Sequence, residues 1–67
     1  MNTVSLNAER EAGLLWRRLP AAENRANRAR VRADRTGRTE HVVAALELEM
    51  RLHRMEAAYY QALALVA

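Results

Sequence analysis

Helix-breaking residues are scarce in this chain, and their positions limit what it can fold into. The 67 residues include two glycines, Gly13 and Gly37, and one proline, Pro20. No glycine or proline follows Gly37. Ala, Leu, Arg and Glu dominate the sequence, and all four favour helix. The chain is therefore predicted to be all-α, with its helices divided at Pro20 and Gly37.

The N-terminal half of a single small domain, residues 1–67, is predicted to hold two short helices. The first covers about residues 7–19, with Asn7 as its N-cap. It ends at Pro20, because the residue before a proline is disfavoured in the α region. The second is an arginine-rich helix over about residues 20–36.

A turn over residues 36–39 is predicted to lead into a third helix. Gly37 is a typical C-terminal stop, and Thr39 is a typical N-cap for the helix that follows. That helix is expected over about 40–66 and to be continuous from 40 to 65. The fold class is thus a small helical hairpin or a three-helix arrangement with a long C-terminal helix.

The third predicted helix carries two apolar stripes. One repeats with heptad-like spacing through Leu48, Leu52, Met55, Tyr59, Ala62 and Val66. The other contains Val42, Val43, Leu46, Met50 and Tyr60. A helix that covers only its own core needs a single stripe. The two stripes predict a protein interface formed by Val42, Val43, Leu46, Leu48, Met50, Leu52, Met55, Tyr59, Tyr60, Leu63 and Val66.

The chain is also too short to build a large core, and it has no cysteine with which to form a disulfide. Self-association or a partner protein is therefore the expected source of extra stability. In that interpretation the two short helices cover one stripe, and a second copy or another protein covers the other. The alternative is that the two short helices cover both stripes within one monomer.

Positive charge is concentrated in the middle of the chain. Residues 17–38 hold eight arginines against Glu23 and Asp34, within a total net charge of +3. The predicted basic surface repeats at helical spacing through Arg25, Arg28, Arg32 and Arg35. Such a surface attracts an acidic protein or the phosphates of a nucleic acid. It is also typical of a solvated face, or of pairing with Glu47, Glu49 and Glu56.

Catalytic chemistry has little support in the sequence. Ser5 is the one serine, cysteine is absent, and His41 and His53 lie twelve residues apart. We therefore expect no enzyme, no cofactor and no small-molecule substrate. Glu49, His53 and Glu56 share one helix face, but they are interpreted as a polar strip between the apolar stripes, and no metal site is predicted.

Two short segments give the chain a resemblance to ribbon–helix–helix DNA-binding proteins, which include many antitoxins. Residues 3–7 alternate polar and apolar residues, as a short β-ribbon does, and residues 35–39 followed by Val42 and Val43 resemble that family's turn and second-helix start. The resemblance implies an intertwined dimer that reads DNA with residues 2–7. Pro20 and the long gap between the two segments depart from the family pattern.

The favoured interpretation is a non-enzymatic helical assembly or adaptor protein, with the DNA-binding regulator as the alternative. The long C-terminal helix is expected to form the oligomer or partner interface, and the arginine-rich helix to present a basic surface to an acidic partner. The longest apolar run, residues 62–67, is too short to span a membrane. A cytoplasmic or virion-internal location is expected.

Overall fold

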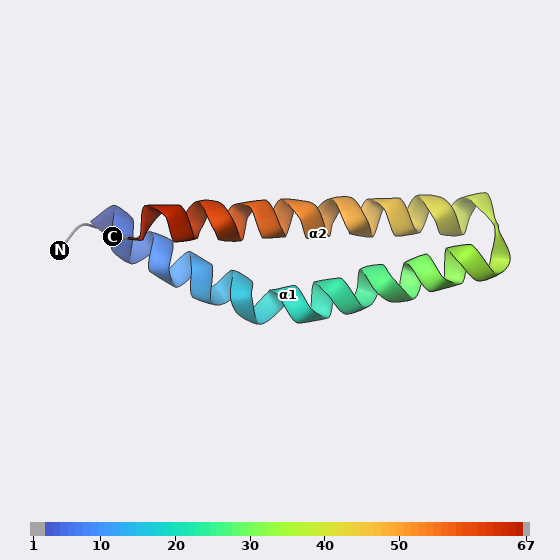
Figure 1. The fold of residues 1–67 in the computed structure, drawn as a ribbon, viewed down its shortest axis with the longest axis horizontal. Coiled ribbons are helices and arrows are strands. Elements are labelled where there is room, and N and C mark those ends of the chain that lie inside the picture. The colour runs from blue at the N-terminus through green and yellow to red at the C-terminus, as the bar shows by residue number, and fades with distance from the viewer. Residues whose placement is uncertain (1–2, 67) are drawn as a thin grey trace.

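The computed structural model describes residues 3–66, and all of its regular structure is helical. Helix α1 (Thr3–Thr36) and helix α2 (Thr39–Leu65) lie antiparallel and form a hairpin (Figure 1). The prediction of an all-α chain is confirmed, and of the two predicted arrangements the hairpin is the one formed. Within residues 3–66, neither helix contains a segment long and apolar enough to cross a membrane.

The predicted break at Pro20 is wrong, because α1 runs through this residue without interruption. Pro20 cannot donate a backbone hydrogen bond to Trp16, so a helix that contains it bends but need not end. Figure 1 shows this bend where the ribbon changes from blue to cyan. Leu19, immediately before the proline, is buried against α2, and this packing offsets the unfavourable backbone position.

Two further sequence predictions are wrong at the N-terminal end of α1. The helix begins at Thr3, so Asn7 lies inside it and is not an N-cap. Residues 3–7 are helical, so the strand predicted there for a ribbon–helix–helix regulator does not form. Asn2, the first residue of that predicted strand, lies outside the described residues.

The turn between the helices depends on Gly37. Its φ of 64° lies in the left-handed region, and its N–H donates to the Ala33 carbonyl at 2.8 Å. The Thr36 hydroxyl donates to the Arg32 carbonyl at 3.0 Å and lies 2.7 Å from His41 Nδ1. Thr39 is the first residue of α2 and Arg38 its N-cap, so the predicted capping role of Thr39 is also wrong.

The core between the helices is built mainly from alanine. On α1 the buried residues repeat every seventh position at Ala12, Leu19, Ala26 and Ala33, preceded by Ala8. On α2 the buried residues are Ala45 and Ala62. No large side chain within residues 3–66 is completely buried. The hairpin therefore buries little apolar volume, and its extents of 53 × 15 × 12 Å make it a rod.

The two glycines provide a matched pair of stability tests. Gly37→Ala should lower the free energy of unfolding by about 1 kcal/mol, because alanine is strained at positive φ. Gly13→Ala should raise it by about 0.5–1 kcal/mol, because Gly13 lies inside α1 and an added Cβ has open space around it. Urea denaturation followed by circular dichroism measures both. Equal effects at the two positions would contradict the turn geometry.

Candidate interaction surfaces

One face of α2 packs against α1. This inner seam consists of Ala45, Leu48, Leu52, Met55, Tyr59, Ala62 and Val66, which alternate steps of three and four residues. Ala45 and Ala62 are buried and the other members are half-buried. Five of the residues predicted as interface therefore lie in the contact between the two helices: Leu48, Leu52, Met55, Tyr59 and Val66.

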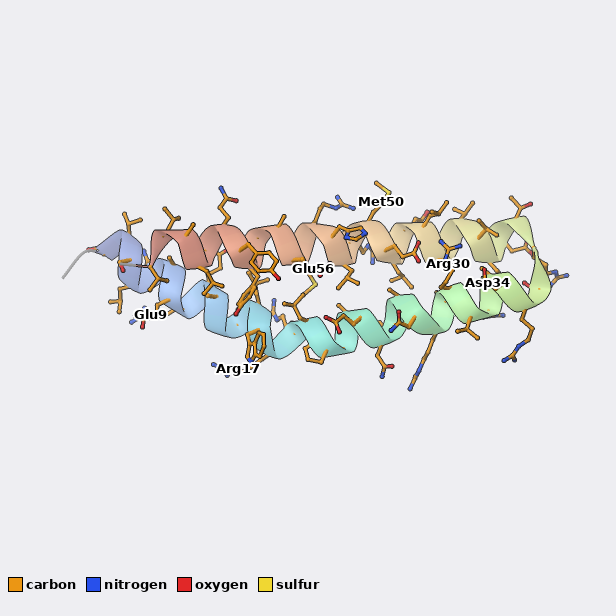
Figure 2. The ribbon with its side chains drawn as sticks, in the orientation of Figure 1. Glu9, Arg17, Arg30, Asp34, Met50 and Glu56 are labelled. Atoms are coloured by element: carbon orange, nitrogen blue, oxygen red, sulfur yellow. The ribbon has the colours of Figure 1, made fainter. Side chains whose placement is uncertain are left out.

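The opposite face of α2 carries a second seam with the same spacing. This outer seam consists of Val43, Leu46, Met50, His53, Ala57, Tyr60 and Ala64, and every one of them is exposed. The side chain of Met50 points away from α1 (Figure 2). The exposed fractions of the large apolar members are 46% for Val43, 49% for Leu46, 59% for Met50 and 66% for Tyr60. Of the two remaining predicted interface residues, Val42 is half-buried and Leu63 is exposed.

These positions exclude one of the two arrangements considered from the sequence. Because α1 is a single helix on one side of α2, it covers the inner seam and leaves the outer seam open. The arrangement in which two short helices cover both stripes is therefore wrong. Patterning alone placed His53 with the polar strip, whereas its exposed position lies in line with Met50 and Ala57.

Three aromatic side chains connect the hairpin contact to the outer seam. The ring centroids of Trp16 and Tyr59 are 5.7 Å apart, and those of Tyr59 and Tyr60 are 5.5 Å apart. These separations are typical of favourable aromatic pairs. The ring of Tyr60 thus packs against Tyr59 of the inner seam, while most of its own surface stays exposed. Trp16, also largely exposed, extends this aromatic surface onto α1.

A continuous arginine face covers the outside of α1. Its members, all exposed, are Arg17, Arg18, Arg25, Arg28, Arg32 and Arg35. Arg17 points away from α2 (Figure 2). The two α1 carboxylates within this stretch, Glu23 and Asp34, project to the other side of the helix according to their spacing. No ion pair joins the arginine face to a carboxylate within residues 3–66.

Two shallow grooves indent this face. Arg28, Arg32 and Arg35 surround Val31 in one of them. Arg17, Arg18 and Arg25 line the other, which Met55 closes from α2. An apolar floor edged by guanidinium groups suits an acidic chain that also carries apolar side chains.

Arg30 differs from the arginine face, because it reaches across to α2. Its Nε and Nη2 donate to the two carboxylate oxygens of Glu49 at 2.9 and 2.5 Å. This bidentate hydrogen bonding lowers the pKa of the Glu49 carboxyl and raises that of the Arg30 guanidinium. The pair fixes the register of the hairpin in the half that lies next to the turn. Of the three glutamates predicted to pair with arginine, Glu47, Glu49 and Glu56, Glu49 is therefore the one that does so within residues 3–66.

Glu49, His53 and Glu56, which share one helix face in the sequence pattern, have separate neighbours in the structure. His53 Nδ1 lies 3.4 Å from Glu56 Oε1, while Glu49 is held by Arg30. Among the described residues, no three potential metal ligands come together. The two seams and the arginine face are therefore the features from which a function has to be argued.

Comparison with known proteins adds nothing to this geometry. The chain matches no protein-family model, no curated protein and no solved structure.

Proposed function

We propose that this chain is a non-enzymatic helical assembly or adaptor protein. Its outer seam docks on a helix of a neighbouring protein molecule, and its arginine face binds an acidic partner. The observation that carries the proposal is the outer seam itself, which repeats apolar residues along the side of α2 that α1 leaves uncovered.

The low apolar content of the hairpin core supports the proposal. A two-helix hairpin whose buried residues are mostly alanine gains little from packing, and proteins of this size commonly rely on a partner for stability. Covering Leu46, Met50 and Tyr60 adds the large apolar surfaces that the hairpin contact lacks. Tyrosine and methionine are also enriched at the centres of protein interfaces.

The arginine face supports the second half of the proposal. Six guanidinium groups that form no ion pair within residues 3–66 generate a positive potential along one side of the rod. Arginine also binds carboxylates in a bidentate geometry, as Arg30 already does with Glu49. Because the outer seam and the arginine face lie on different helices, one molecule can contact two partners at once.

The outer seam can be tested by photo-crosslinking in the cells that make the protein. A photoreactive amino acid at Met50 should form covalent adducts with a neighbouring protein molecule, because this side chain lies within the proposed interface. The same group at Arg51, an exposed neighbour outside the seam, is the control and should give few adducts. Absence of adducts at Met50, or equal yields at the two positions, would refute docking through this seam.

The arginine face can be tested by binding to poly-glutamate at low salt. Replacing Arg28 and Arg32 with Gln should weaken binding by roughly two- to thirtyfold, because each exposed ion pair contributes about 0.2–1 kcal/mol. The affinity of the unmodified chain should fall with added salt. Fluorescence titration measures both effects.

Arg38 and Arg51 provide the matched control, since both are exposed and changing both to Gln removes the same charge outside the arginine face. An equal loss from this control would mean that binding follows total charge and not the arginine face. Duplex DNA is titrated in parallel. Tighter binding to DNA than to poly-glutamate at the same salt would replace the acidic partner with a nucleic acid.

A further inference from the structure

We infer that the molecule that covers the outer seam is a second copy of this chain, packed antiparallel to the first, so that the two α2 helices contact each other and each α1 lies on the outside. The inference rests on the proposed function and names its partner. In the inferred register, Met50 of one copy faces His53 of the other, Leu46 faces Ala57, and Val43 faces Tyr60. The two-fold axis passes between the Met50 and His53 positions of the outer seam.

The exposed area of the hairpin matches what such a dimer needs. A compact monomer of 7.6 kDa exposes about 4300 Å². This chain exposes 5296 Å², an excess of roughly 1000 Å² over that relation. A stable interface buries about 800 Å² on each partner. The excess is thus sufficient for one interface along the rod.

Side-chain sizes along the outer seam fit the antiparallel arrangement. Each large residue lies opposite a smaller or flatter one: Leu46 opposite Ala57, Tyr60 opposite Val43, and Met50 opposite His53. Such alternation fills the space between two helices evenly. A parallel arrangement instead places Tyr60 against Tyr60 and Ala57 against Ala57, which crowds one layer and leaves another empty.

Charges on one flank of the seam select the register. Glu47 has no ion-pair partner within residues 3–66, and in this register it lies beside Arg54 of the second copy. The two-fold symmetry forms this pair twice. Sliding the copies by seven residues toward their C-terminal ends brings Arg54 against Arg54 and Glu56 against Glu56. Like charges in these positions disfavour that register.

The other flank contains two acidic side chains and two apolar ones. Val42 lies beside Leu63 of the second copy, which extends the apolar contact. Glu49 and Glu56 also meet here, but each already has a basic neighbour in its own chain. Arg30 holds Glu49 through two hydrogen bonds, and His53 Nδ1 lies 3.4 Å from Glu56. The Arg30 guanidinium offsets the charge of Glu49 and so reduces the repulsion between the two carboxylates.

The inferred dimer leaves both arginine faces free. Each α1 lies on the outside of the dimer, so the two faces point in opposite directions. Two copies then present two equivalent surfaces to acidic partners. Dimerisation would therefore make the adaptor bivalent and strengthen its binding to a partner with repeated acidic segments.

Disulfide trapping tests this register directly, because the natural chain has no cysteine. Leu46→Cys protein is mixed with Ala57→Cys protein and oxidised under mild conditions. We expect the covalent heterodimer as the main product, since a disulfide needs Cβ atoms about 4 Å apart. Circular dichroism confirms that each variant is folded. Sedimentation equilibrium of the natural chain should give twice its mass of 7.6 kDa.

Two controls use the same Leu46→Cys protein. Mixed with Ala64→Cys, it should give little heterodimer, because Ala64 lies one heptad beyond Ala57. Alone, it should give little homodimer, because the inferred register holds the two copies of residue 46 far apart. A main product in either control would overturn the inferred register.

A natural chain that sediments as a monomer at high concentration would overturn the inferred second copy altogether. The proposed function survives that result if photo-crosslinking at Met50 captures a different protein in the cell. Adducts between two copies of the chain would support both proposals. If Met50 captures nothing and the chain stays monomeric, both fail.

Discussion

The contact between the alanine-rich face of α1 and the inner seam of α2 holds the described part of this chain together. Small residues at Ala12, Ala26 and Ala33 allow the helices to approach closely, but they remove little apolar surface from water. The bidentate pair of Arg30 and Glu49 fixes how the two helices are aligned. It adds little to the free energy of unfolding, since both side chains remain partly exposed. A seam with so little apolar volume accounts for the rod shape and for the large exposed surface.

The sequence predicted helix over about residues 7–36 and 40–66, because residues that favour helix dominate it and breakers are few. It failed at Pro20, where a local rule on the residue before proline was outweighed by tertiary packing. Leu19 is buried beside the proline, and Trp16, one turn earlier, contacts the ring of Tyr59. The bend lets α1 bow outward where the largest side chains of the contact lie. Such a compensation depends on the opposite helix and is invisible to a local pattern.

Spacing alone revealed two apolar stripes on the C-terminal helix, but it did not reveal which of them contacts α1. The structure assigns Leu52 and Met55 to the contact with α1 and leaves Met50 outside. Continuing the steps of three and four residues through His53 and Ala57 would have identified the full outer seam. These two residues were left out of the predicted stripe because they are not strongly apolar. Similarly, Arg30 was separable from the arginine face by spacing, whereas its pairing with Glu49 required the hairpin register.

We propose that the hairpin is an incomplete fold whose outer seam is covered by a neighbouring protein molecule. Met50 and Met55 are natural reporters, since Met50 lies in the outer seam and Met55 in the inner seam. The most direct measurement is the rate at which hydrogen peroxide oxidises each methionine, compared between producing cells and dilute purified protein. We expect the oxidation rate of Met50 to be much lower in cells than in dilute purified protein. The oxidation rate of Met55 should differ much less between the two settings. Equal rates for Met50 in both settings would contradict the account.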